Sequence, residues 1–179
     1  MFQQLVPINR AQHAGKKIKQ AQSFAFSANA HLASLMIHEF VRAAAIYPIM
    51  FIEDKQQDEF RPVALLGLTS GENLFVDGTG QWKASYVPAI VRRYPFALAR
   101  TGQEGQFTVC VDQDSELLND TEGQALFTEA GEPSELLEKV KRYLGELEQM
   151  DRMTREFCQY LSSHNLLAPL NMRIRDQAQ

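Results

Sequence analysis

The chain has 179 residues, of which 45% are hydrophobic and 22% are charged, and its formal net charge is -4 at pH 7. This composition excludes a disordered chain, and the acidic balance argues against a protein that binds nucleic-acid backbones. The length is that of one domain, or of one domain with an appendage. No apolar run approaches the roughly 18 to 20 residues of a membrane-spanning helix, so we expect no membrane span.

The N-terminal part, residues 1–22, holds few apolar groups and a basic cluster at Lys16, Lys17 and Lys19. We expect a solvated arm, with contact to an anion or a partner as the alternative. The start lacks a basic segment followed by an apolar run, so we expect no Sec-type signal peptide and a cytoplasmic protein. The spacing of two phenylalanines in residues 23–27 predicts a short strand.

Two Tyr-Pro dipeptides organise the centre of the chain, at Tyr47 and Tyr94. Proline cannot donate a hydrogen bond inside a helix and holds the preceding residue extended, so a helix should end near each tyrosine. A short apolar run, a polar turn and a second apolar run follow each dipeptide. The predicted hairpins are residues 49–52 with 61–68, and 96–99 with 107–111. The repeated unit could reflect a duplication, or a recurrent way to pack a helix on a hairpin.

Further elements are predicted from local turn and cap signals. Residues 74–76 read as a strand closed by Asp77-Gly78, and Ser85 is a plausible N-cap for a helix over residues 86–93. Residues 112–132 form an acidic loop with one short helix around residues 124–128. Pro133 then opens a long helix over residues 133–163.

The predicted fold class is α+β, a mostly antiparallel sheet of hairpins with short covering helices and a long C-terminal helix. Residues 1–131 are expected to form the core domain. Residues 132–179 are expected to form the long helix and a tail, with a possible strand at 170–174. A helix of about 30 residues spans roughly 45 Å. Part of it could therefore project onto a protein partner or a second copy, and the alternative is two helices folded back on each other.

The search for catalytic and metal-binding motifs gives no pattern that is complete. Residues 67–72 have the glycines of a phosphate loop but no lysine. The pair His38-Glu39 begins a zinc-protease helix motif, but Arg42 stands where the second histidine belongs. Residues 112–117 lack the turn glycine of a calcium loop.

The histidines and cysteines carry no stronger signal. His13, His31 and His38 could converge with Glu39, but their spacing favours single structural or exposed histidines. We therefore predict no metal and no cofactor. Cys110 and Cys158 fall in a predicted strand and helix, which favours two buried, reduced thiols over a disulfide.

One cluster of aromatic, arginine and polar residues is the candidate ligand or partner surface. These residue types are enriched where proteins bind other proteins. The same cluster would suit a small anionic or peptide-like ligand, and the plainest alternative is that its aromatics cap the core while its arginines pair with surface acids. Its members are Glu72, Asn73, Asp77, Trp82, Tyr86, Arg92, Arg93 and Tyr94.

Three strings of this sequence carry a family resemblance: LVPINRAQHAG at the start, then GENLFVD and YVPAIVRRYPF. On these strings the chain closely resembles the bacterial SapC-like family, whose name comes from a surface-layer gene cluster and is shared with an unrelated transporter permease. The likeness covers most of residues 5 to 100. Family members usually continue beyond Leu167 with strand-like sequence, so we expect either a short member or a piece of a longer protein.

The absence of a complete catalytic motif favours a non-catalytic binding or assembly protein. The resemblance implies that it acts with surface-layer, export or envelope-linked systems, through a protein partner or through self-association by the long helix. The alternative is an enzyme, or an accessory subunit of one, with a small-molecule site between Glu72 and Tyr94.

Overall fold

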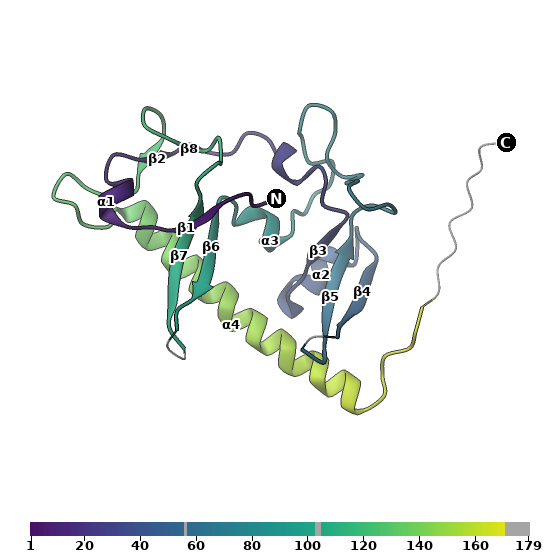
Figure 1. The fold of residues 1–179 in the computed structure, drawn as a ribbon. Coiled ribbons are helices and arrows are strands. Elements are labelled where there is room, and N and C mark those ends of the chain that lie inside the picture. Colours follow the sequence, from purple (N-terminus) through teal and green to yellow (C-terminus); the bar gives the residue numbers. More distant parts are fainter. Residues whose placement is uncertain (56, 103–104, 171–179) are drawn as a thin grey trace.

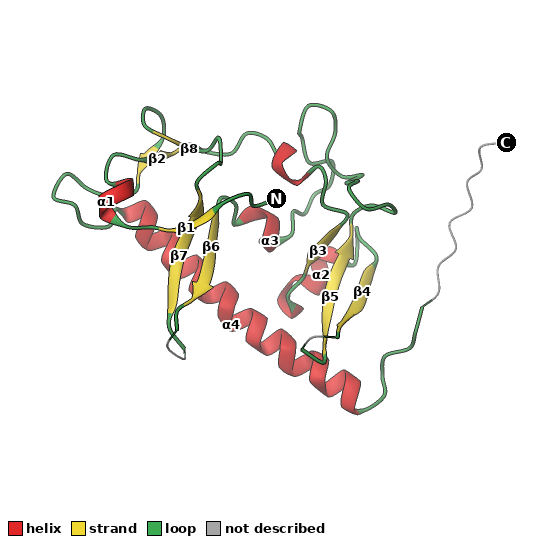
Figure 2. Ribbon diagram, viewed as in Figure 1, coloured by secondary structure: helices red, strands yellow, loops and turns green. Residues whose placement is uncertain are grey.

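The computed structural model describes residues 1–55, 57–102 and 105–170. It confirms the α+β fold class: three small antiparallel sheets and several short helices lie along one long C-terminal helix (Figure 2). The two larger sheets stand side by side on this helix (Figure 1). The predicted strand at residues 170–174 lies, apart from Leu170, outside the described residues.

The sheet β3-β5-β4 contains the first predicted hairpin. β4 (Ile49–Asp54) pairs antiparallel with β5 (Glu59–Leu65), and β3 (Leu32–Ser34) pairs with the other side of β5. The helix before it is short: a 3-10 turn at Ile37–Glu39 leads into α2 (Phe40–Ala43). It ends before Tyr47-Pro48, as the proline restriction predicts.

The sheet β1-β7-β6 contains the second predicted hairpin. β6 (Phe96–Arg100) pairs antiparallel with β7 (Phe107–Asp112), and α3 (Ala89–Arg92) precedes it. The third strand, β1 (Leu5–Pro7), comes from the N-terminus and pairs with β7. The expectation of a solvated N-terminal arm is therefore wrong for these residues, since their backbone completes a sheet.

The two sheets share one pairing register. The carbonyl of Pro48 accepts from Leu65 N at 3.0 Å, and the carbonyl of Pro95 accepts from Asp112 N at 2.9 Å. The added strand matches as well: Leu66 N donates to the carbonyl of His31, and Gln113 N donates to that of Gln4, both at 2.8 Å. The repeat thus extends from the hairpin to the whole three-stranded sheet, which favours duplication over chance recurrence.

A third, smaller sheet has the order β8-β2-β9 and lies near α1 (Arg10–His13). Its strands are β2 (Lys17–Ile18), β8 (Leu118–Asn119) and β9 (Gln124–Ala125). The short helix predicted around residues 124–128 is therefore wrong. Leu126 and Phe127 are buried after β9, so this loop joins the core by strand pairing.

The long helix α4 spans Glu135–Ser163 as one continuous helix, not two folded back. It begins one residue after Ser134, whose side chain accepts from Leu137 N at 3.2 Å, so Pro133 lies just before the cap. Leu137, Leu144 and Leu147 are buried in the core under β1-β7-β6. Further along, Thr154 accepts a hydrogen bond from Ile37 N at 2.9 Å, which ties α4 to the turn before α2.

Three local predictions fail for identifiable reasons. Residues 23–27 form a 3-10 turn at Ala25–Ser27, closed by the hydroxyl of Ser27 on the carbonyl of Phe24. The helix predicted from Ser85 begins only at Ala89, because Pro88 lacks an N–H and holds the residue before it extended. The strand at residues 74–76 is reduced to one isolated bridge between Val76 and Trp82.

Cys110 and Cys158 are both free and buried, as predicted. Burial raises the pKa of the Cys158 thiol to about 11, with a smaller contribution from Glu59. Because only the thiolate reacts, we expect a thiol reagent at pH 8 to react with the native protein at least roughly a hundredfold more slowly than with the unfolded chain. Absorbance of the released thionitrobenzoate measures this; equal rates before and after denaturation would contradict the buried placement.

Candidate functional site

Tyr86, one of the candidate residues, bonds to a buried carboxylate, that of Glu39, which the sequence had suggested only as part of incomplete metal-binding patterns. Its side chain is 1% exposed. Oε2 accepts from Met36 N at 2.9 Å, and Oε1 accepts from Ala89 N at 2.8 Å and from the Tyr86 hydroxyl at 2.6 Å. Glu39 therefore joins the turn before α2 to the start of α3, and its hydrogen-bonding capacity goes into the fold.

Trp82, Tyr86 and Tyr47 form an aromatic group above this carboxylate. The Trp82 indole N–H donates to the Tyr47 hydroxyl at 2.9 Å and to the Tyr86 carbonyl at 3.1 Å, and the Tyr47 hydroxyl also donates to that carbonyl. Phe75 packs edge-on against Tyr47, with ring centroids 4.7 Å apart. These contacts hold the loop after β5 over α2, which agrees with the interpretation of Trp82 and Tyr86 as core-capping residues.

Arg92 reaches this group through Tyr86. Its guanidinium carbon lies 5.7 Å from the Tyr86 ring centroid, and its Nε donates to the carbonyl of Val87 at 2.9 Å. Trp82 and Arg92 thus meet on two sides of the same residue. The Arg92 residue itself is exposed.

Burial, together with the bond to Glu39, raises the pKa of Tyr86 from 10.0 to about 12. Above pH 10 the unfolded state loses this proton first, so the stabilising contribution of Tyr86 should be complete below pH 10 and should disappear by about pH 12. We expect the difference in unfolding free energy between wild type and Tyr86→Phe to shrink over that interval. Urea unfolding at a series of pH values measures it; a constant or growing difference would contradict the assignment.

Glu72, Asn73 and Asp77 lie in the loop between β5 and Trp82, and the side chain of each is hydrogen-bonded within the protein. Asn73 is buried and donates to the carbonyl of Ser27 at 3.0 Å. Asp77 accepts from the hydroxyl of Thr79 at 2.7 Å and from two backbone N–H groups of its own turn; these bonds, the hydroxyl first, lower its pKa. Glu72 accepts from the hydroxyl of Thr69 at 3.1 Å.

Tyr94 and Arg93 lie toward the other sheet. The Tyr94 ring stacks on Phe26 with centroids 4.1 Å apart, and its hydroxyl donates to Asp112 at 3.2 Å. Asp112 is fully buried and also accepts from the backbone N–H groups of Gln3 and Gln4, at 3.0 and 2.8 Å. Arg93, Tyr94 and Arg92 line a cleft of about 350 Å³. The eight candidate residues therefore do not form one site. Three belong to the loop after β5, Trp82 and Tyr86 belong to the aromatic group, and Arg92, Arg93 and Tyr94 line this cleft.

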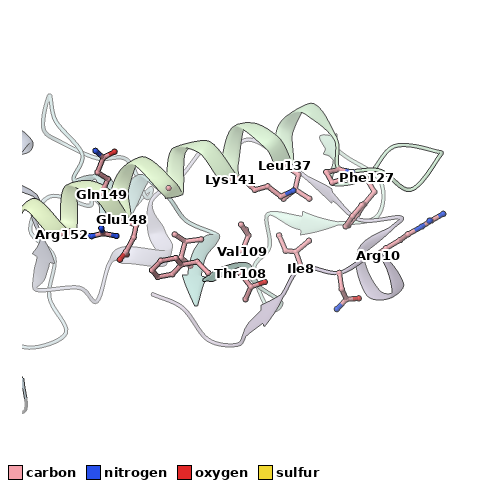
Figure 3. A pocket seen from close by; sticks show the side chains of 15 residues that line it. Ile8, Arg10, Thr108, Val109, Phe127, Leu137, Lys141, Glu148, Gln149 and Arg152 are labelled. Carbon is pink, nitrogen blue, oxygen red and sulfur yellow. The ribbon is translucent and has the colours of Figure 1, made fainter. Parts of the chain in front are cut away.

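A larger groove, of about 880 Å³, lies between α4 and the sheet β1-β7-β6 (Figure 3). Figure 3 shows Ile8 and Val109 on its sheet side, Leu137 and Lys141 on α4, and Glu148 and Arg152 toward its far end. Gly145 lies in the α4 stripe between these residues, and nothing would stand within 4 Å of a Cβ built there. We call this feature the helix groove.

Sequence reasoning missed both the helix groove and the role of Glu39. One signal for the groove is present in the sequence: a glycine in the middle of a 29-residue helix costs stability, and Gly145 is such a residue. Glu39 gave no such signal, because Ala89 lies 50 residues away along the chain.

Among the described residues, no group of three or more histidine, cysteine or acidic side chains could hold a metal ion. In the same part of the chain, no helix is both long and apolar enough to cross a membrane. His13 is buried, and its ring forms its hydrogen bonds with the backbone of Asn9, not with His38.

No curated protein and no solved structure matches the chain. The SapC family model matches residues 8–179, which is nearly the whole sequence. The three strings that carried the resemblance lie wholly or largely inside that range, and the chain therefore belongs to the SapC family.

Proposed function

We propose that this chain is a non-catalytic binding or assembly protein, and that the helix groove receives a segment of a partner protein. The resemblance to the SapC-like family suggests surface-layer, export or envelope-linked systems as its setting. The groove is the observation that carries the proposal. It has the size of a ligand or peptide site and is formed by two rigid elements, a sheet and a long helix.

The chemistry of the groove indicates what kind of segment would fit. Its floor is apolar, with Ile8, Leu98 and Val109 from the sheet facing Leu137 from α4. Cationic side chains outnumber acidic ones along its lining, and these charged residues are Arg10, Lys141 and Arg152 against Glu148. Glu148 also faces Arg155, at 3.8 Å, and Lys141 pairs with Glu138 at 2.7 Å, so Arg10 and Arg152 supply the remaining positive charge. A segment with two or three apolar side chains and flanking acidic residues would complement this surface.

The hydrogen bonds that the acidic side chains in and near the candidate cluster already accept favour a binding role over the enzyme alternative. Glu39, Asp77 and Asp112 each accept three hydrogen bonds from the protein itself. Glu72, the other acid of the candidate cluster, accepts one, from the hydroxyl of Thr69. A general base needs a free acceptor within reach of a substrate proton.

Gly145 offers a matched pair of variants that separates the groove from the fold. Gly145→Ala should raise the free energy of unfolding by about 1 kcal/mol, because alanine favours the helix and its Cβ meets open space. Gly145→Trp should leave the protein folded while its side chain fills the groove. Urea unfolding measures both effects.

Native mass spectrometry of the two variants, purified from the protein's own host, tests the proposal. We expect wild type and Gly145→Ala to carry the same stoichiometric partner and Gly145→Trp to lose it. A homodimer that is lost in the Trp variant would identify a second copy as the partner. A complex that survives in the folded Trp variant would contradict the groove as its binding surface.

A further inference from the structure

The sheet β3-β5-β4 ends in an open edge at β4. Among the described residues β4 pairs only with β5, and Figure 1 shows it as the outermost strand of its sheet, on the side away from β1-β7-β6. The carbonyl of Pro48 accepts from Leu65 N, so these two residues form a hydrogen-bonded pair. Such pairs alternate along an antiparallel ladder, and the N–H and C=O groups of Ile49, Phe51 and Glu53 therefore point away from β5.

The other strand edges of the two larger sheets are shorter or blocked. β1 and β3 have three residues each, and the outward-facing Pro7 of β1 has no N–H to donate. On β6, the N–H of Phe96 already donates to the carbonyl of Arg93 at 2.8 Å, and the strand ends in the cation Arg100. β4 has six residues, no proline and no basic side chain, and its acids stand at one end. It therefore has the fewest of the features that keep a sheet edge from pairing.

The side chains of β4 complement a second copy of the same strand. In an antiparallel pair centred on Phe51, this residue lies opposite its own copy, and Ile49 of each copy lies opposite Glu53 of the other. This centre pairs all three outward-facing residues with one another, so each pair exchanges two backbone hydrogen bonds. Between these pairs, Met50 of one copy lies opposite Ile52 of the other, and Ile52 is an apolar side chain that is 39% exposed in the single chain.

The size of this contact sets its strength. A pairing about a two-fold axis uses the same strand on both copies and closes at two. A strand of six residues buries less than the roughly 800 Å² per partner of a standard interface, so the dimer should be weak and should form in the micromolar to near-millimolar range.

We propose that β4 pairs with β4 of a second copy, so that the two three-stranded sheets join into one continuous antiparallel sheet. The proposal does not rest on the helix groove, because no residue of β4 lines that groove. A homodimer that survives Gly145→Trp and is lost when β4 is altered belongs to this edge, and the complex with a different protein remains the test of the groove.

Glu53→Pro and Glu53→Thr form a matched pair of variants. Both remove the exposed carboxylate, but only proline removes the outward-facing N–H, and it leaves the hydrogen bonds to β5 in place. In sedimentation equilibrium we expect wild type and Glu53→Thr to dimerise and Glu53→Pro to dimerise roughly tenfold or more weakly, because the dimer loses one hydrogen bond at each end. Wild type that stays monomeric to near-millimolar concentration, or equal dimerisation of the two variants, would overturn the proposal.

Cysteine crosslinking keeps the test decisive if Glu53→Pro does not fold. A mixture of Met50→Cys and Ile52→Cys proteins places two thiols directly opposite each other, with Cα atoms about 4.5 Å apart, which a disulfide can bridge. Either variant alone has its two thiols on a diagonal, about 7 to 8 Å apart, and the native cysteines are buried. Mild oxidation should therefore give a disulfide dimer mainly from the mixture. No dimer, or equal yields from the mixture and the single variants, would contradict this register.

Discussion

Replacing Glu39 with alanine is expected to lower the free energy of unfolding by about 3 to 5 kcal/mol. The substitution leaves three donors without their acceptor: the backbone N–H groups of Met36 and Ala89 and the hydroxyl of Tyr86. Each buried donor left unpaired costs about 1 to 3 kcal/mol, and the three losses are not additive. A loss of this size is a large part of the stability of an ordinary domain.

Urea unfolding followed by the fluorescence of Trp82, the single tryptophan, measures this effect directly. Trp82 is a suitable reporter because it bonds to the Tyr86 carbonyl beside the Glu39 network. Glu146→Ala, on the exposed surface of α4, is the control and should change stability by less than about 0.5 kcal/mol. Equal stabilities of the two variants would show that Glu39 does not join α2 and α3.

Shortening Leu144 to alanine is expected to cost about 3 to 4 kcal/mol. The side chain is 1% exposed and lies in the core between the sheet β1-β7-β6 and α4. The loss combines the buried methyl groups with the cavity that remains, because the flanking helix and sheet can close only partly around it. The long helix would then hold the two sheets together less firmly.

Met153→Ala provides the matched control on the same helix, since Met153 is 48% exposed. It should cost less than about 1 kcal/mol. Thermal and urea unfolding of the two variants give the comparison. If Leu144→Ala were no more destabilising than Met153→Ala, the packing of α4 on the sheets would be wrong.

The hairpins and the long helix could be predicted because their signals are local. The Tyr-Pro dipeptides stop the helices, the polar turns separate the strands, and Pro133 marks the start of α4 to within two residues. The position of β1 depends instead on its pairing with β7, in which Leu5 lies opposite Asp112. Nothing in the sequence around Leu5 indicates so distant a partner. The small sheet β8-β2-β9 has strands of two residues, too short for any periodicity.

The candidate site also combines features that the sequence indicates locally with contacts between distant segments that it does not. Aromatic and arginine residues near Trp82 could be singled out by type, and Trp82, Tyr86 and Arg92 do lie together. Glu72 and Asp77 were included by proximity in sequence, but their side chains bond within their own turns. The helix groove and the cleft at Arg93 each combine segments more than 40 residues apart, so only the folded structure brings their linings together.

Site-specific photo-crosslinking in the native host shows whether a partner protein occupies the helix groove. A benzophenone amino acid would replace Lys141 or Gln149, which line the groove, and Arg142 or Glu146, which are exposed on α4 outside it. We expect one discrete protein adduct from the two groove positions, none from the two control positions, and loss of the adduct when Gly145→Trp is added. Adducts of equal yield from both pairs, or no adduct from the groove, would contradict it.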